Sequence, residues 1–437
     1  MQQEENEGEK LNNQIKEEFI IERSAKIYKK ENTFFNPAQM LNRDISLEAI
    51  KLYFEERSTF KVLLAMAASG LRGIRYLNDI DNCNVYFNDL SKEAIESIKE
   101  NLILNGHNDH EIVEKINHDH NRKITILNKD CNVLMNEITR FFDVIDIDPF
   151  GSCSPFVDAA FKAVKHNGLI CFTSTDKAAL CSKTTKCFLK YNSVIKRNFC
   201  KNETPIRVLL SFLSREIAKY DASIEPLISF SVDYYLRVIV RVIKGKGRKA
   251  IENNSYAFIC DCQNFTEVEI KNGIKFNNKS KCDFCDKERN LYGPFWNKNI
   301  NDKAFISKLL NRITEKNNER TVGLLRYLEH ELNTMFYYEM PVLSSILKKP
   351  AIKLHKMLTG LANKGYKASL THGDLNSFKT NAPFNVITFL FLNIEENPDL
   401  IVKNDNVENI FKINFYKKEI SSGMKPGSLP KTSKNSN

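Results

Sequence analysis

The sequence predicts an α/β protein whose larger part is an open, mostly parallel sheet. Over about the first 240 residues, short apolar runs alternate with stretches of helical pattern, which is the order of βαβ units. A turn of small residues, 67–70, follows the first run predicted to lie in this sheet, and Asp89 and Asp130 end the next two. Because open α/β sheets bind ligands beyond the carboxyl ends of their strands, these observations predict a binding site at one edge of the sheet.

Length and composition bound the other possibilities. A chain of 437 residues is too long for one ordinary domain, so two or three are expected. No run of 18 apolar residues exists, so we expect no membrane-spanning helix and no membrane partner. Residues 1–17 are rich in Glu, Gln and Asn and residues 416–437 in Lys, Ser and Asn, which predicts two disordered tails. The first tail resembles neither a secretory signal nor a transit peptide, so we expect the nucleus or the cytoplasm.

The formal net charge of +10 favours an anionic partner, of which nucleic acid is the commonest. A lysine-rich surface that serves only solubility would carry the same charge. The motifs, and not the charge, decide between these two interpretations.

The first elements lead to the small-residue turn. Residues 19–27 alternate between apolar and polar side chains, which predicts a strand, and a helix is expected over 46–56. Residues 61–66 form the first strand of the sheet, and Gly70 then opens a helix. Small residues at this point let a ligand approach the free N–H groups of the helix N-terminus. The turn is not G-x-G-x-x-G, so a dinucleotide is not indicated.

Acidic residues follow the second and third strands. Asp89 lies 19 positions after Gly70, where a carboxylate commonly accepts hydrogen bonds from ribose hydroxyls. Its alternative role is the N-cap of the helix expected over 91–105. Asp130 ends the strand at 123–131, where it could bond an adenine amine.

The fourth strand, 141–147, is an apolar run interrupted by acids that ends at Asp148-Pro149-Phe150-Gly151. A carboxylate, a carbonyl and an aromatic ring are thus presented together, a set that suits an amino group on a flat heterocycle. The alternative is that the Asp-Pro pair only ends the strand, as such pairs often do.

The remaining elements complete the sheet. They are a helix over 155–166, a strand over 168–175, a helix over 205–220, and a hairpin of 224–231 with 234–242. The alternation, with acids at three strand ends, is typical of a class I S-adenosylmethionine-dependent methyltransferase (Rossmann-like) domain, which we place at residues 18–245.

A smaller α+β C-terminal domain is predicted over 246–415, where the composition shifts. Residues 245–249 are basic and contain glycine, which suits either a flexible linker or a hairpin turn. Apolar residues at helical spacing over 342–361 indicate a small winged module. His372 and Lys379 are expected either on an RNA-binding face or at a helix cap.

Four cysteines of this second domain form two close pairs, Cys260 with Cys262 and Cys282 with Cys285. The second pair is C-x2-C, and the 20 positions from Cys262 to Cys282 suit a zinc ribbon. The first pair is C-x-C, one residue shorter than usual, and free thiols are the alternative. A zinc ion held by four thiolates would have no open position, so the site would be structural.

Several short motifs occur along the chain in a fixed order. They are residues 34–39, 42–44, 68–75, 146–152, 155–160, 175–176, 224–227, 293–296, 371–373 and 379–383. With these motifs the chain resembles the tRNA (guanine-26-N2)-dimethyltransferase family from about residue 18 to residue 385. Cys153-Ser154 and Asn192 depart from the residues usual in the family, at positions outside the proposed chemistry.

The resemblance implies transfer of one or two methyl groups from S-adenosyl-L-methionine to the exocyclic N2 of guanine 26 in tRNA. It implies that Asp148 is the catalytic acceptor, in a loop where Pro149 and Phe150 contact the same base. The residues that it assigns to the cofactor pocket are Phe34, which would close it, Arg43, Gly70, Arg72, Asp89, Asp130 and Cys131. It also implies a C-terminal domain that binds RNA and four cysteine ligands for zinc, and we expect a monomer.

Two other functions stay open at this point. One is a methyltransferase for another amine, such as adenine N6 in rRNA or DNA, because the Asp-Pro-Phe set serves any planar amine. The other is a non-catalytic RNA-binding protein on a methyltransferase scaffold, which would not need the acids at the strand ends.

Overall fold

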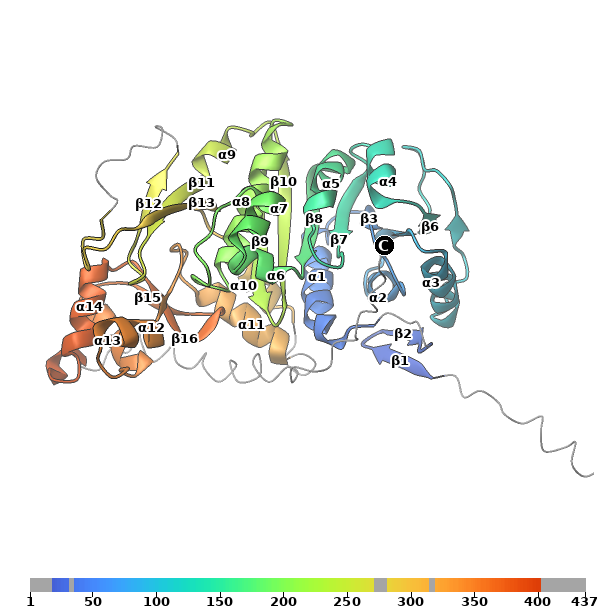
Figure 1. Ribbon diagram of the computed structural model, residues 1–437. Coiled ribbons are helices and arrows are strands. Elements are labelled where there is room, and N and C mark those ends of the chain that lie inside the picture. The colour runs from blue at the N-terminus through green and yellow to red at the C-terminus, as the bar shows by residue number, and fades with distance from the viewer. Residues whose placement is uncertain (1–17, 31–34, 271–280, 314–318, 402–437) are drawn as a thin grey trace, which may run out of the picture.

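Eight strands form the central sheet of the computed structural model, which describes residues 18–30, 35–270, 281–313 and 319–401 (Figure 1). The strand order is β5-β6-β4-β3-β7-β8-β10-β9, and β10 alone runs antiparallel to its neighbours. The strands are β3 (Phe60–Leu64), β4 (Cys83–Asp89), β5 (Glu111–Ile112), β6 (Ile124–Asn128), β7 (Phe142–Ile147), β8 (Val164–Ser174), β9 (Ala222–Val232) and β10 (Tyr235–Lys244). The predicted open, mostly parallel sheet is confirmed.

Helices cover both faces of this sheet, and each face has its own apolar core. One core joins the sheet to α1 (Met40–Tyr53), α2 (Leu71–Asp79), α3 (Lys92–Leu104), α10 (Lys303–Leu310) and α11 (Glu319–His330). The other joins it to α4 (Cys131–Glu137), α5 (Val157–Ala163), α6 (Lys177–Cys181), α7 (Thr184–Tyr191) and α8 (Thr204–Ala218). β7 is buried along its whole length because both of its faces are covered.

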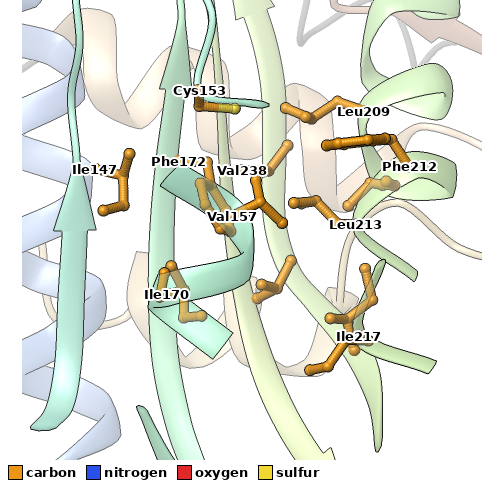
Figure 2. Close-up of a cluster of buried hydrophobic side chains, with 14 of the residues drawn as sticks. Ile147, Cys153, Val157, Ile170, Phe172, Leu209, Phe212, Leu213, Ile217 and Val238 are labelled. Atoms are coloured by element: carbon orange, nitrogen blue, oxygen red, sulfur yellow. The ribbon is translucent and has the colours of Figure 1, made fainter. Parts of the chain in front are cut away.

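The packing of α8 against the sheet shows how the second core holds together. Figure 2 shows Leu209, Leu213 and Ile217 on the side of α8 that faces the sheet, in the same core as Phe172 of β8 and Val238 of β10. All but Phe212 among the labelled α8 side chains of this core are fully buried. Truncation of one such leucine to alanine would cost about 2–5 kcal/mol of stability.

The beginning of the chain differs from the single strand predicted over 19–27. The chain turns at Arg23, whose φ is 55°, and forms a hairpin of β1 (Phe19–Glu22) and β2 (Ala25–Tyr28). The following helical stretch also begins earlier than expected, with η1 (Pro37–Gln39) leading into α1. The Asn36 side chain caps this start, because its Oδ1 accepts a hydrogen bond from the Ala38 N–H at 3.1 Å.

The chain after residue 245 adds two small sheets. The first has the order β12-β11-β13, with β11 (Asn254–Ile259), β12 (Phe265–Glu269) and β13 (Asn290–Trp296). The second has the order β14-β16-β15, with β14 (Tyr338–Glu339), β15 (Ala368–Thr371) and β16 (Asp374–Thr380). This second sheet packs with α12 (Met340–Leu347), α13 (Leu354–Asn363) and α14 (Phe384–Asn393). Three short helices lie elsewhere in the chain: η2 (Ser154–Phe156), α9 (Lys249–Glu252) and η4 (Pro398–Ile401).

Helices α12 and α13 are followed by strands β15 and β16, which is the arrangement expected of the winged module predicted at 342–361. We name residues 338–393 the C-terminal module. It lies at the opposite end of the molecule from the β1–β2 hairpin (Figure 1). Side chains of β11 and β13 belong to one core of the central sheet, and side chains of α10 and α11 belong to the other. The chain after residue 245 therefore also stabilises the central sheet. The boundary at 245 stays a prediction.

Residues 245–249 form a turn and not a flexible linker. The N–H groups of Gly245 and Lys246 donate to the carbonyl of Asp221, and Gly247 N–H donates to its side chain. Within the described residues, no helix is both long and apolar enough to span a bilayer.

Candidate active site

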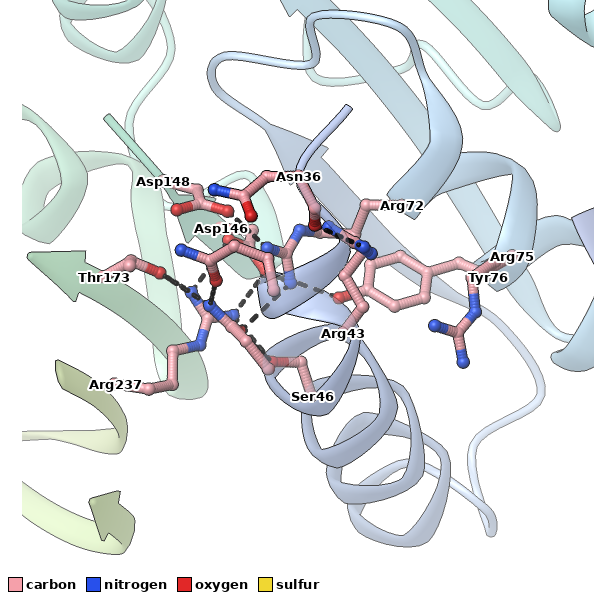
Figure 3. Close-up of polar contacts among 12 residues, drawn as sticks. Asn36, Arg43, Ser46, Arg72, Arg75, Tyr76, Asp146, Asp148, Thr173 and Arg237 are labelled. Atoms are coloured by element: carbon pink, nitrogen blue, oxygen red, sulfur yellow. Dashed lines mark hydrogen bonds and ion pairs between the residues drawn. The ribbon is translucent and has the colours of Figure 1, made fainter. Parts of the chain in front are cut away.

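Asp148 stands directly after β7, at the edge of the sheet where the sequence predicts the site. Its Oδ2 accepts a hydrogen bond from Arg72 Nη2, and Arg72 Nη1 lies 3.6 Å from Asp146 Oδ2 (Figure 3). The Asp148 side chain is 25% exposed and that of Arg72 only 10%. Asp148 Oδ1 has no hydrogen-bond partner among the described residues, so one carboxylate oxygen remains available to a donor.

A buried ion pair lies beneath this contact. Arg237 of β10 donates to both carboxylate oxygens of Asp146, at 3.1 and 2.6 Å. The same guanidinium donates to Thr173 Oγ1 at 2.9 Å and to Ser46 Oγ at 2.8 Å. Burial alone would raise the pKa of Asp146, but Arg237 and Arg72 outweigh it and lower that pKa.

Arg72 joins the buried pair to the exposed carboxylate. It lies at the start of α2, and Gly73 beside it lets this helix approach the sheet, because a Cβ there would be 2.3 Å from Phe87 Cε1. Burial alone would lower the pKa of Arg72, but Asp146 and Asp148 raise it. The cluster therefore holds two carboxylates and two guanidiniums in one chain of contacts, which we name the active-site network.

The Asp89 side chain fixes the turn before α2. Gly70 has a φ of +79°, a conformation that favours glycine, and it stands at the N-terminus of α2. The Asp89 carboxylate accepts hydrogen bonds from the N–H groups of Ala68 at 2.9 Å and Ser91 at 3.0 Å. Ser91, and not Asp89, is the N-cap of α3. Asp89 thus fixes the turn at the strand ends.

The third strand end carries the next two predicted residues. Asp130 caps α4, because its Oδ1 accepts hydrogen bonds from the N–H groups of Asn132 and Val133 at 2.8 and 3.0 Å. Cys131 is buried beside it, and burial together with Asp130 raises the pKa of this thiol to about 11. At neutral pH the thiol is protonated, so Cys131 behaves as a small apolar side chain and not as a nucleophile.

Arg43 faces a protein carboxylate. Its Nε donates to Glu22 Oε1 at 2.7 Å, and its Nη2 donates to Glu22 Oε2 and, at 3.0 Å, to the Asn36 carbonyl. These contacts tie the β1–β2 hairpin to α1 beside the active-site network. Phe34, the residue predicted to close the pocket, lies outside the described residues.

The loop after Asp148 carries the other two catalytic candidates. Pro149 is buried, and Phe150 is 84% exposed. The next residue pairs with the end of β8, since Gly151 N–H donates to Thr175 Oγ1 at 2.8 Å and Thr175 N–H donates to the Gly151 carbonyl at 2.9 Å. The loop is therefore fastened on one side while its aromatic ring faces outward.

The four cysteine thiols converge far from this loop. Their Sγ atoms all lie within 4.8 Å of one another, with Cys260 to Cys285 at 3.4 Å and Cys262 to Cys282 at 3.6 Å. Thiolates placed tetrahedrally about 2.3 Å from a zinc ion stand about 3.8 Å apart, so these spacings fit one ion. Burial alone would raise the pKa of Cys282, but the N–H groups of Cys285 and Phe284 and the Asn264 amide lower it to about 6. The short C-x-C pair does not prevent convergence.

Comparison with known proteins shows the family to which this chain belongs. The model of the family described as N2,N2-dimethylguanosine tRNA methyltransferase matches residues 12–391. The chain belongs to this family.

Individual members of the family align with most of this chain. A Drosophila melanogaster protein named tRNA (guanine(26)-N(2))-dimethyltransferase is 30% identical over 84% of this chain and 74% of its own. A Methanobrevibacter smithii protein of the same name is 33% identical over 81% of this chain and 89% of its own. A solved structure titled as Trm1 from Pyrococcus horikoshii in complex with S-adenosyl-L-methionine superposes with a TM-score of 0.73 at 29% identity, covering 85% of this chain and 98% of that one.

Two motif residues of this family member lie elsewhere than predicted. Lys379 is 1% exposed, and its Nζ lies 2.9 Å from Glu203 Oε2 and 3.4 Å from Glu331 Oε1. His372 Nδ1 lies 2.6 Å from Glu331 Oε2. Neither an RNA-binding face nor a helix cap describes them, because both belong to a buried ion network between α8, α11 and the C-terminal module.

Sequence reasoning also missed residues that shape the active site. The sequence motifs do not include Arg237, and they contain Asp146 only as the first residue of the motif at 146–152. A signal for both exists, because a charged residue inside an apolar β-branched run needs a buried partner of opposite charge. Tyr191 is another such residue, because its hydroxyl lies 2.6 Å from Ser152 Oγ in the loop at 148–152, which we name the catalytic loop for the role proposed below.

Proposed function

We propose that this protein transfers one or two methyl groups from S-adenosyl-L-methionine to the exocyclic N2 of guanine 26 in tRNA. The observation that supports this most is the partly exposed end of the active-site network, where Asp148 keeps one carboxylate oxygen available beside Pro149 and Phe150. The family to which the chain belongs is the one described by dimethylguanosine formation in tRNA.

The cofactor pocket is proposed along the neighbouring strand ends. Gly70 opens the N-terminus of α2 to a ligand, and Asp89 and Asp130 present carboxylates after β4 and β6. Cys131 would line the apolar wall, and Arg43, Arg72 and Phe34 would complete the pocket. When bound, S-adenosyl-L-methionine supplies a methyl group on a positively charged sulfur.

The chain's own residues would then prepare the amine. The lone pair of the guanine N2 is delocalised into the ring, so the nitrogen is a poor nucleophile. Asp148 Oδ1 and the Pro149 carbonyl would accept its two N–H bonds, which favours a pyramidal nitrogen with its lone pair directed at the methyl group. As the new C–N bond forms, Asp148 would take the proton that the nitrogen loses. Phe150 would stack on the base, which must leave the helical stack to reach this edge.

The base itself is assigned by the family and not by the carboxylate. Adenine N6 is also a planar amine, and Asp148 with Pro149 would accept its N–H bonds equally well. The remaining N–H of a singly methylated guanine could rotate to the same acceptors, so the site permits a second transfer.

We also propose that Cys260, Cys262, Cys282 and Cys285 hold a structural zinc ion. Four thiolates fill a tetrahedral ion completely, so the ion would brace the β11–β12 region against the C-terminal module and take no part in the transfer. Metal analysis of the purified protein is expected to find one zinc per chain, lost in a Cys282→Ser variant. A chain free of zinc would refute this site.

We further propose that the protein binds tRNA partly through the C-terminal domain, works as a monomer, and acts in the nucleus or the cytoplasm. Every residue of the active-site network comes from one chain, so a second copy is not needed to complete it. The name of the Saccharomyces cerevisiae relative includes the word mitochondrial, so imaging of a tagged chain is needed for the compartment.

The reaction is tested with labelled S-adenosyl-L-methionine and two tRNA transcripts that differ only at position 26. We expect label in N2-methylated guanosine from the transcript with guanine and none from the one with adenine. Equal label in both would retain a methyltransferase but refute the target. No label in either, with the cofactor still bound, would refute the proposed reaction.

A further inference from the structure

The segment between β8 and α8 carries an unusual surface next to the catalytic loop. Residues 175–203 hold seven lysine or arginine residues and two acidic ones. The segment contains α6 and α7, and α7 lies beside α8 on the same side of the sheet (Figure 1). None of these cations has a role in the chemistry proposed above.

Helix α7 has one buried face and one apolar exposed face. Cys187 and Tyr191, four positions apart, are fully buried. Phe188 and Leu189, between them, are 53% and 74% exposed. Single exposed apolar residues are common on soluble proteins, but two large neighbours on one helix leave a patch that no described element covers.

Tyr191 fastens this helix to the catalytic loop. Its hydroxyl lies 2.6 Å from Ser152 Oγ and donates to Asp176 Oδ1 at 2.8 Å. Ser152 is four positions after Asp148, and Asp176 follows the end of β8. Phe188 and Leu189 therefore stand within one helical turn of a residue that contacts the loop bearing Phe150, which is itself 84% exposed.

Cations lie in the same segment of the chain as the apolar pair. Lys190 is paired with Asp176 at 2.9 Å and Lys196 contacts Asp261. Lys183, Lys186 and Arg197 are exposed, and none of the three forms an ion pair with a described residue. An occupant of this surface must therefore offer both flat apolar groups and negative charge.

We propose that this surface, which we name the α7 patch (Lys183, Lys186, Phe188, Leu189 and Arg197), binds the tRNA nucleotides that flank the target guanine. When the base leaves its stack, the faces of its neighbours are uncovered, and apolar side chains are the usual means of covering them. The three cations would contact the adjoining phosphates. The inference rests on the proposed function, since only an enzyme acting on a stacked base uncovers such faces.

The apolar pair is tested with Phe188→Ser/Leu189→Ser in the full chain, and with Leu189→Ser alone. Ile103→Ser is the matched control, because Ile103 on α3 is 56% exposed and lies on another helix of the molecule. We expect the double variant to raise KM for tRNA about 10-fold or more and to reduce the fluorescence gain of a tRNA with 2-aminopurine at position 26. Binding of S-adenosyl-L-methionine is expected to match that of the control.

The cations are tested with Lys183→Gln/Lys186→Gln/Arg197→Gln, with Lys51→Gln of α1 as the control. The slope of log affinity against log salt concentration is expected to fall by roughly 2, at somewhat under one per phosphate contact. An unchanged KM, an unchanged fluorescence gain and a wild-type salt slope would overturn the proposal. A dimer of the wild-type chain that Leu189→Ser dissociates, with tRNA affinity unchanged, would overturn it too and assign the patch to self-association.

The outcomes also separate this inference from the reaction itself. If the wild-type chain methylates guanine 26 and the α7 variants do so equally well, the α7 patch is refuted and the reaction is supported. If the wild-type chain binds tRNA without transfer and the variants weaken that binding, the patch is supported as an RNA surface and the reaction is refuted.

Discussion

Two buried ion networks of this protein have similar chemistry and different ends. The active-site network runs from Arg237 through Asp146 and Arg72 to Asp148. The second, which we name the junction network, joins Glu203 and Arg207 of the α8 region to Glu331, His372 and Lys379. In the first, the last carboxylate is 25% exposed, whereas all five side chains of the second are at most 5% exposed.

The difference separates a polar residue that can bind a ligand from one that only stabilises the fold. Both networks contain residues of the family motifs, so motif membership does not separate them. Asp148 Oδ1 lacks a partner among the described residues, whereas Lys379 and Glu331 form ion pairs with each other and with buried neighbours. A network with an accessible, unsatisfied end can act on a ligand, and a closed network can only hold elements together.

The largest loss of stability is expected when the active-site network is broken at its buried end. In Arg237→Met, the Asp146 carboxylate keeps only Tyr76 at 3.3 Å and Arg72 at 3.6 Å as close charged or polar partners. Removing one partner of a buried ion pair costs about 3–5 kcal/mol, so the midpoint of urea unfolding should fall accordingly. We also expect transfer to be lost, because Arg72 would be drawn from Asp148. A midpoint equal to that of the wild type would show that the two networks are not alike in their buried parts.

A smaller loss is expected from the junction network. In Lys379→Met, Glu203 and Glu331 lose the cation between them, but Arg207 still donates to Glu203 at 2.6 Å and His372 still faces Glu331. We therefore expect a loss of about 2–3 kcal/mol, below the range for a fully uncompensated charge. The rate of methyl transfer per folded molecule should stay near that of the wild type. A folded variant that binds tRNA but has lost transfer would show that this network, too, serves the chemistry.

The sequence was sufficient for the sheet and for the strand ends that carry the candidate site residues. Apolar runs, turns and strand-end acids are local signals, and they located β7, Asp148, Asp89 and Asp130 correctly along the chain. It was not sufficient for the networks, because Arg237 and Asp146 are 91 positions apart and pair only once the strand order is known. His372 and Lys379 were misplaced for the same reason, since Glu331, which contacts both, and Glu203, which contacts Lys379, lie far from them in the sequence.

Acid should weaken both networks, beginning with the junction. The pKa values of Glu203 and Glu331 are lowered in the folded protein from 4.5, mainly by Lys379 for the first and His372 for the second, against the raising effect of burial. A lowered pKa contributes stability that is present above pH 4.5 and is lost as pH falls toward the folded-state value. Asp146 has a lower starting value of 3.8, so its contribution should begin to fall at a lower pH.

This order can be measured by urea unfolding at a series of pH values. In Glu331→Gln the decline just below pH 4.5 should be shallower than in the wild type, because one of the two titrating glutamates is gone. Equal slopes in the two proteins over that interval would contradict the assignment of the junction network to this pH range.

The smallest change in stability and the most direct test of the account come from Asp148→Asn. Asp148 is partly exposed and Arg72 keeps Asp146 as a partner, so we expect a stability change below about 1 kcal/mol. Binding of S-adenosyl-L-methionine should be retained, and transfer to guanine 26 of tRNA should fall by about 10²–10⁴-fold, because an amide cannot take the proton of the amine. Near-normal transfer by this variant would contradict the claim that the open end of the active-site network performs the chemistry.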